Sequence, residues 1–134
     1  MSEKKIIRLP ESELEIMQAI WALKEDGEQW VSAGVIMKRF PEITRLKLTT
    51  VLTLITRLHN KGFISTEKIG RANSYTPIIT SEEYRRFATE DFVKKVYMND
   101  RMDLINKLFA TNSFSADELE EIKQTIKENE NNNH

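Results

Sequence analysis

The stretch 50–77, which reads TVLTLITRLHNKGFISTEKIGRANSYTP, decides the fold of this chain. Its first part repeats apolar residues at helical spacing and ends at Asn60-Lys61-Gly62, where glycine favours a helix C-terminus. Two strand-like runs, 63–68 and 73–78, follow and are joined by a turn that contains Gly70. A helix followed by a hairpin with a basic tip is typical of a winged helix-turn-helix, which lays a helix in the DNA major groove.

Two further helices are predicted before this stretch. Ser12 and Glu15 form a capping-box pattern, in which each side chain satisfies the other residue's backbone N–H, at the start of a helix that runs to about Lys24. Ser32 is placed to cap a second helix that reaches Phe40 and stops before a proline. The third helix, at about 47–61, is expected to bury an apolar face made of Val51, Leu54, Ile55 and Leu58.

Helical patterns also follow the hairpin. A hydroxyl cap and acidic residues at 80–83 start a helix of about 81–98, a shorter helix spans about 102–110, and Ser115 and Glu118 form a second capping box. The polar, Asn-rich end is expected to be disordered. We therefore predict a mainly α chain with a small β wing: a winged helix-turn-helix domain at 1–79, a helical dimerisation region at 80–127 and a disordered tail at 128–134.

Composition excludes several classes of protein. Of the 134 residues, 40% are hydrophobic and 31% are charged, and the apolar runs are short, so a cytoplasmic protein without a membrane span is expected. There are no cysteines and only two histidines, so we expect no metal site. The chain has no glycine-rich phosphate loop and no nucleophile with a plausible histidine partner. We therefore expect no enzymatic activity and no cofactor.

Charge is distributed unevenly along the chain. The formal net charge is only -1, but the segment 38–77 holds eight lysines and arginines against two glutamates. Beyond Ser81 the acidic residues outnumber the basic ones. Basic residues often decorate a solvated surface and nothing more, but here they coincide with the helix and the hairpin tip that a DNA-binding protein would use. This coincidence favours double-stranded DNA as the partner.

The outward face of the third helix is rich in threonine, which offers base edges both a hydroxyl and a methyl group. Leu52 on this face either contacts a thymine methyl or is an ordinary exposed apolar residue. The lysines and arginines are expected to contact phosphates and thus to supply affinity rather than specificity. The predicted DNA-binding residues are Lys47, Thr49, Thr50, Leu52, Thr53, Thr56, Arg57, Lys61, Lys68 and Arg71.

The helices after the hairpin carry apolar stripes that are too short to bury much against one another. A short amphipathic helix gains most of its stability from tertiary partners, so we expect these stripes to pack against a second copy of the chain. The alternative is a monomer in which they fold back onto the first domain. The predicted dimerisation residues are Phe92, Val96, Leu104, Ile105, Leu108, Phe109, Leu119, Ile122 and Ile126.

The chain resembles the penicillinase repressor family of the BlaI, MecI and CopY type from Leu9 to about Lys127. The resemblance rests on the order and spacing of four pieces: Leu14-Glu15-Ile16-Met17 with Trp21, the third helix through Asn60-Lys61-Gly62, Gly70-Arg71 with Tyr75-Thr76-Pro77, and Ser81-Glu82-Glu83-Tyr84. It implies a homodimeric winged-helix repressor that binds a pseudo-palindromic operator through its N-terminal domain and dimerises through its C-terminal helices.

Two departures from the family pattern concern the operator and induction. Family members often begin the third helix with a Ser-Pro-Lys or Thr-Pro-Lys type sequence, whereas this chain has Lys47-Leu48-Thr49, so the operator can differ. The Asn-Phe bond that is cleaved in penicillin-responsive members corresponds approximately to Lys107-Leu108, and the cysteine-rich tail of copper-responsive members is absent. The inducer or protease that relieves repression is therefore not identified by the sequence.

The leading hypothesis is a dimeric, sequence-specific repressor that occupies an operator. Two alternatives stay open: a winged-helix module that binds another protein, with Leu52 as an anchor, and a DNA-binding protein without sequence preference. Steep weakening of binding by salt favours DNA over a protein partner.

Overall fold

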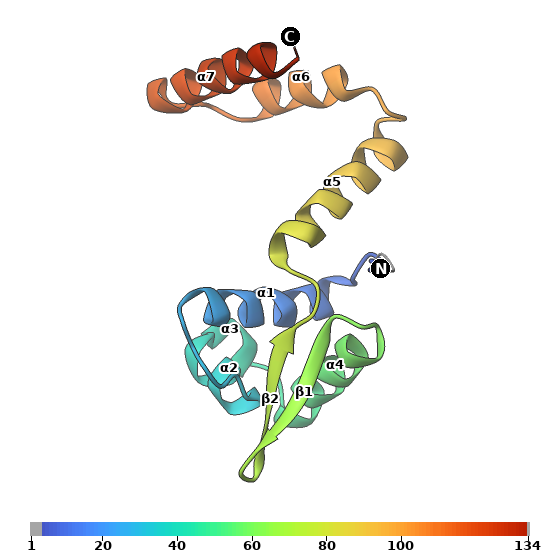
Figure 1. Ribbon diagram of the computed structural model, residues 1–134, viewed down its shortest axis with the longest axis vertical. Coiled ribbons are helices and arrows are strands. Elements are labelled where there is room, and N and C mark those ends of the chain that lie inside the picture. The colour runs from blue at the N-terminus through green and yellow to red at the C-terminus, as the bar shows by residue number, and fades with distance from the viewer. Residues whose placement is uncertain (1–3, 134) are drawn as a thin grey trace. The chain divides into compact units, whose positions relative to one another are not determined.

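The computed structural model describes residues 4–133 and contains two compact units, Met1–Thr89 and Glu90–His134 (Figure 1). The first unit holds helices α1 to α4, the hairpin β1–β2 and the beginning of α5. The second unit holds the end of α5 together with α6 and α7. A mainly α chain with a winged-helix domain, as the sequence predicted, is confirmed.

Helix α1 (Glu11–Glu25) provides the centre of the first core. Its apolar residues recur at helical spacing, so Ile16, Met17 and Ile20 are all fully buried. The predicted capping box is wrong, because Pro10 is the N-cap residue and Ser12 lies inside the first turn. Leu14 donates its N–H to the Pro10 carbonyl, 2.9 Å away, so the helix starts earlier than the Ser12 pattern indicates.

Helix α2 (Ala33–Arg39) begins as predicted, because the Ser32 hydroxyl accepts the Val35 N–H at 3.2 Å. The sequence analysis missed the next element, the four-residue helix α3 (Pro41–Thr44). Proline suits the first position of a helix because its missing N–H has no partner there in any case. Ile43 of this short helix is buried in the core, which fixes the path of the chain toward the third predicted helix.

Helix α4 (Leu48–Asn60) matches the third predicted helix to within one residue at each end. All four residues of the predicted inner face are buried, and the helix packs chiefly against α1. Gly62 has a φ of 81°, a left-handed conformation that other residues resist, so the chain can leave the helix sharply and enter the hairpin.

Strands β1 (Ile64–Ile69) and β2 (Ala72–Pro77) form an antiparallel hairpin whose pairing runs from Ile64–Pro77 to Ile69–Ala72. Gly70 has a φ of 63°, while Arg71 does not have a positive φ, a combination that fits a type II′ turn. The hairpin is anchored to the body because the Val31 carbonyl accepts the Tyr75 N–H at 2.8 Å. Its tip extends beyond the helices of this unit (Figure 1).

Helix α5 (Ser81–Val96) starts with a capping box in which Thr80 and Glu83 bond each other's N–H at 3.1 and 2.9 Å. Tyr84 is buried in the first core, and its hydroxyl accepts the Leu9 N–H at 2.9 Å. The first unit therefore reaches Thr89, ten residues past the expected boundary at 79. The helix ends at Val96 because Met98 and Asn99 adopt left-handed backbone conformations.

Helices α6 (Arg101–Thr111) and α7 (Ala116–Asn132) follow in the second unit. Asp100 caps α6 by accepting the Asp103 N–H at 3.0 Å, and the predicted capping box of Ser115 and Glu118 is confirmed at the start of α7. Helix α7 continues beyond Lys127, so residues 128–132 are helical where the sequence predicted disorder. The last residue of the chain lies outside the described range.

Candidate nucleic-acid interface

The outward face of α4 carries the threonines that the sequence assigned to DNA. Thr49, Thr50, Thr53 and Thr56 are all exposed, and they share this face with Leu52, whose side chain is 39% exposed. The opposite face of the same helix is buried in the core, so the backbone of α4 is held rigidly while this face stays free. Leu48, at 51% exposure, adds a second apolar side chain that the sequence analysis did not include.

The hydroxyl groups of two of these threonines donate hydrogen bonds to backbone carbonyls within the helix. Thr53 Oγ1 donates to the Thr49 carbonyl and Thr56 Oγ1 donates to the Leu52 carbonyl, both at 2.9 Å. Each hydroxyl therefore presents acceptor lone pairs and a neighbouring methyl group to an incoming ligand. Acceptors suit the amino groups of adenine and cytosine, and methyl groups suit thymine.

The start of α4 has a positive electrostatic character. Lys47 is the N-cap residue, no side chain caps the first turn, and no acidic residue lies in that turn. The unpaired N–H groups and the helix dipole therefore act together with the exposed Lys47 ammonium. This end of the helix can accept a phosphate group of a DNA backbone.

The hairpin tip provides the second basic position. Arg71 occupies the turn itself and Lys68 lies three residues before it, and both side chains are exposed. Lys68 pairs with Asn73 across the hairpin, so these two side chains share one face. The structure thus places Arg71 in the exposed hairpin turn and Lys68 close to it.

Ion pairs neutralise several of the basic residues of the segment 38–77. Arg39 binds Asp26 and Glu28 at 3.3 and 2.9 Å. Arg45 binds Glu15 at 2.9 Å, and this hydrogen bond raises the pKa of the Arg45 guanidinium above its ordinary value. Because these acids precede the segment in the chain, a count of charges within the segment overlooks them.

Lys61, which the sequence assigned to the DNA backbone, has an internal partner instead. Its ammonium binds the carboxylate of Glu13, whose side chain is only 3% exposed. A buried carboxylate requires a compensating charge, so this contact holds α1 against the end of α4. The Lys61 side chain is 28% exposed, and its ammonium is engaged in this ion pair.

The other basic residues that were predicted to bind DNA are not neutralised by salt bridges within residues 4–133. Among the salt bridges formed within residues 4–133, none involves Lys47, Arg57, Lys68 or Arg71. All four side chains are exposed, with Arg57 on the last turn of α4. The predicted DNA-binding cations that form no salt bridge within residues 4–133 therefore lie at the two ends of α4 and in or near the hairpin turn.

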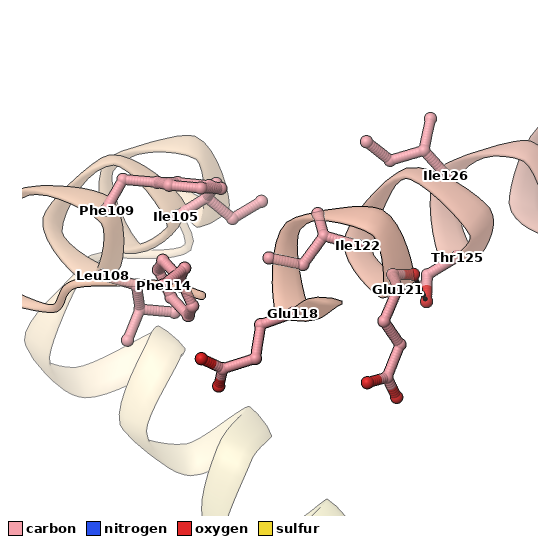
Figure 2. A pocket seen from close by; sticks show the side chains of 9 residues that line it. All are labelled: Ile105, Leu108, Phe109, Phe114, Glu118, Glu121, Ile122, Thr125 and Ile126. Atoms are coloured by element: carbon pink, nitrogen blue, oxygen red, sulfur yellow. Dashed lines mark hydrogen bonds between the residues drawn. The ribbon is translucent and has the colours of Figure 1, made fainter. Parts of the chain in front are cut away.

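The predicted dimerisation residues lie in the second unit and are largely uncovered in the single chain. Leu104 and Ile122 are partly buried, whereas the exposed members are Phe92, Val96, Ile105, Leu108, Phe109, Leu119 and Ile126. A hollow of about 560 Å³ lies between α6 and α7. Figure 2 shows apolar side chains from both helices beside it, with the carboxylates of Glu118 and Glu121 extending away from Ile126.

Between residues 4 and 133, no cluster of three or more histidine, cysteine or acidic side chains could hold a metal ion. In the same range, no helix has both the length and the apolar character needed to cross a membrane.

Comparison with known proteins identifies the family to which this chain is similar. The family model described as penicillinase repressor matches residues 9–128. The chain is 25% identical over 128 residues to the penicillinase repressor of Bacillus licheniformis, with 96% of each chain covered. It is 27% identical over 124 residues to the methicillin resistance regulatory protein MecI of Mammaliicoccus sciuri, covering 92% of this chain and 97% of that protein.

Among solved structures, the chain is similar to the DNA-binding domain of the repressor BlaI in solution. The match has a TM-score of 0.49 and 29% sequence identity, and it covers 61% of this chain and 94% of that domain.

Proposed function

Because the chain belongs to the penicillinase repressor family, we propose that it is a homodimeric, sequence-specific repressor that binds a pseudo-palindromic DNA operator. In this proposal, each protomer places α4 in the major groove of one half-site and sets the hairpin tip against the neighbouring backbone. Occupation of the operator by the dimer excludes RNA polymerase.

The observation that carries the proposal is the outward face of α4. A buried inner face fixes the helix, the outer face offers threonine acceptors and methyl groups, and unpaired basic side chains lie at both ends. A recognition helix needs these three properties: rigid placement, groups that distinguish base edges, and nearby cations that bind phosphates.

Individual roles follow from what each side chain offers. Thr53 can accept from an adenine or cytosine amino group, because its own proton already bonds the Thr49 carbonyl. Leu52 fits a thymine methyl better than any polar group. Lys47, Lys68 and Arg71 are assigned to phosphates, and Lys61 is removed from the DNA-binding set because of its bond to Glu13.

The proposed dimer rests on the apolar surface of the second unit. Soluble monomers rarely expose a contiguous apolar patch of this kind, and here residues on both sides of the α6–α7 hollow are uncovered. A second copy would cover them through a two-fold interface in which each patch meets its equivalent. Two-fold symmetry of the protein then matches an inverted repeat in the DNA.

In vitro selection from random duplex DNA with the full chain tests this function. Enrichment of an inverted repeat, with binding that weakens steeply as salt rises, is the expected result. Selection repeated with Lys47→Ala should retain the same sequence at lower affinity, since a phosphate contact carries no base preference. Absence of any enriched sequence would refute sequence-specific binding, and a salt-insensitive complex with another protein would favour the protein-interaction alternative.

A further inference from the structure

A hollow of about 350 Å³ lies between α4 and the β1–β2 hairpin. Leu52 and Ile55 of α4 form an apolar part of its wall, and the polar part is formed by Thr56 and His59 of α4, Thr66 of β1, and Asn73 and Tyr75 of β2. These elements lie side by side in the first unit (Figure 1). None of the residues that line the hollow is acidic. Leu52 and Thr56 of this lining were assigned to DNA bases, whereas His59, Thr66, Asn73 and Tyr75 have no assigned role.

Strand register explains why polar groups of the hairpin gather here. Thr66 pairs with Tyr75, and Lys68 pairs with Asn73, so all four side chains project from the same face of the hairpin. That face is the one turned toward α4, since Thr66, Asn73 and Tyr75 line the hollow. The Lys68 ammonium therefore belongs to the same side and lies nearer the tip.

The hollow can donate hydrogen bonds to an anion. The imidazole of His59, the hydroxyl of Thr66 and the amide of Asn73 are exposed donors. The phenol of Tyr75 is a further donor, and burial raises its pKa above the ordinary value, opposed by a smaller contribution from a hydrogen bond with Asn73. Thr56 is the exception, because its proton bonds the Leu52 carbonyl.

We propose that this hollow is a phosphate seat that holds one backbone phosphodiester of the operator between α4 and the hairpin, with Thr66, Asn73 and His59 as its donors. The inference rests on the proposed function. A strand of sugar and phosphate borders the major groove, so it passes between a helix in that groove and a hairpin tip that lies against the neighbouring backbone. The hollow lies on that path and offers donors, with Lys68 as the nearby cation.

The seat gives these residues a positioning function. A phosphate held on both sides fixes how deeply α4 enters the major groove and how far the hairpin advances along the duplex. Phosphate contacts set register in this way and carry no sequence preference of their own. Removal of the donors should weaken binding to every sequence equally.

A double-mutant cycle between the protein and single phosphates tests the seat. The selected duplex is made with one neutral methylphosphonate at a time, and each duplex is titrated with the full wild-type chain and with Thr66→Val/Asn73→Ala. Wild type should lose about tenfold in affinity at one phosphate per half-site, the loss that corresponds to one hydrogen bond to a charged group. In the double variant, the same methylphosphonate should cost less than about twofold.

Thr76→Val is the matched control, because Thr76 is exposed on the opposite face of the same hairpin, paired with Ser65. Valine suits strands, so both threonine variants should fold, and their melting temperatures verify this. The control should show the full tenfold loss at the sensitive phosphate. An equal loss in wild type and in Thr66→Val/Asn73→Ala would overturn the seat while leaving operator binding intact. Failure to select any duplex would instead overturn the proposed function, and the seat with it.

Discussion

Replacement of Lys61 by methionine tests whether this lysine is part of the fold or part of the DNA surface. The substitution keeps most of the side-chain length and removes the positive charge that compensates Glu13. Glu13 has a side chain only 3% exposed, so Lys61→Met leaves a carboxylate buried without a partner. Loss of one partner from a buried pair typically costs about 3–5 kcal/mol.

The lower end of that range applies here, because the Lys61 side chain is 28% exposed and water can partly replace it. We therefore expect the free energy of unfolding of the first unit to fall by about 3 kcal/mol. For a domain of this size the melting temperature should drop by roughly 12–24 °C. The compensating double variant Glu13→Gln/Lys61→Met should recover most of the loss, since it removes the buried charge as well.

Urea unfolding followed by tryptophan fluorescence measures this change. Both tryptophans lie in the first unit, and a Trp30→Phe background leaves the buried Trp21 as the single reporter. Protein concentration is held fixed, since dimerisation makes apparent stability depend on it. The same variants are titrated with DNA at several salt concentrations.

Lys68→Met is the matched control, because Lys68 is exposed and the described residues give it no salt bridge. It should change stability by less than about 0.5 kcal/mol but reduce the salt slope of DNA binding by about 0.9 for each protomer, or about 1.8 for the dimer. Lys61→Met should do the reverse. If Lys61→Met kept its stability and reduced the salt slope, Lys61 would contact DNA and the assignment to the core would be refuted.

Three further outcomes are expected. Ile126→Glu should convert the dimer to a monomer, as measured by light scattering. Gln124→Glu adds the same charge at an exposed position of α7 and should leave the dimer intact. If both variants remained dimeric, the α6–α7 face would be excluded from the interface. Thr53→Ala should change base preference at one position per half-site by roughly 1 kcal/mol in repeated selection, and an unaltered preference would reject that contact. The Thr80 N–H and, as the second largest cause, the Lys4 ammonium donate hydrogen bonds to Glu83 and lower the pKa of its carboxyl group from 4.5. The ionised Glu83 therefore stabilises the folded state above pH 4.5, and this stabilisation is lost as the pH falls through the lowered pKa. Acid titration of unfolding should therefore be shallower below about pH 4.5 for Glu83→Gln than for wild type, and identical curves would contradict it.

Local patterns in the sequence were sufficient for most of the first unit. The apolar spacing of α4 and the glycine after it define a helix within itself, and the turn at Gly70 fixes the hairpin register without help from the rest of the chain. Ser12 shows where such a pattern misleads. Its sequence fits a capping box, but Pro10 starts the helix first and Glu15 binds Arg45 instead.

Contacts between distant residues could not be predicted in the same way. Glu13 and Lys61 are separated by 48 positions, and no local signal distinguishes Lys61 from a lysine that contacts DNA. The salt bridges of Arg39 and Arg45 likewise join these arginines to acidic residues from earlier in the chain, so no local pattern predicts them. The hollow between α4 and the hairpin depends on the register of the strands and on the packing of the hairpin against the helix, so the residues that line it form no sequence motif.

Boundaries after the hairpin also depended on packing and on capping. Tyr84 bonds the Leu9 N–H and thereby joins the start of α5 to the first core, which no pattern near Thr80 indicates. Helix α7 continues past Lys127 although its end is rich in asparagine, and the Asn129 side chain bonds the Thr125 carbonyl at 2.8 Å. The predicted DNA-binding and dimerisation residues stay predictions, and the core role of Lys61 is a proposal that rests on its ion pair with Glu13.

Helical phasing of the operator tests whether one dimer binds both half-sites at once. Two proteins are compared: the full chain and a chain that ends at Thr89, the limit of the first unit. Each is titrated with the selected inverted repeat and with an extended duplex, which carries about five extra base pairs, roughly half a helical turn, between the half-sites. Two linked half-site contacts should let the full chain bind the intact repeat at least about 100-fold more tightly than the extended one, while the shortened chain binds both alike. Equal affinity of the full chain for the two duplexes would contradict a dimer that reads both half-sites.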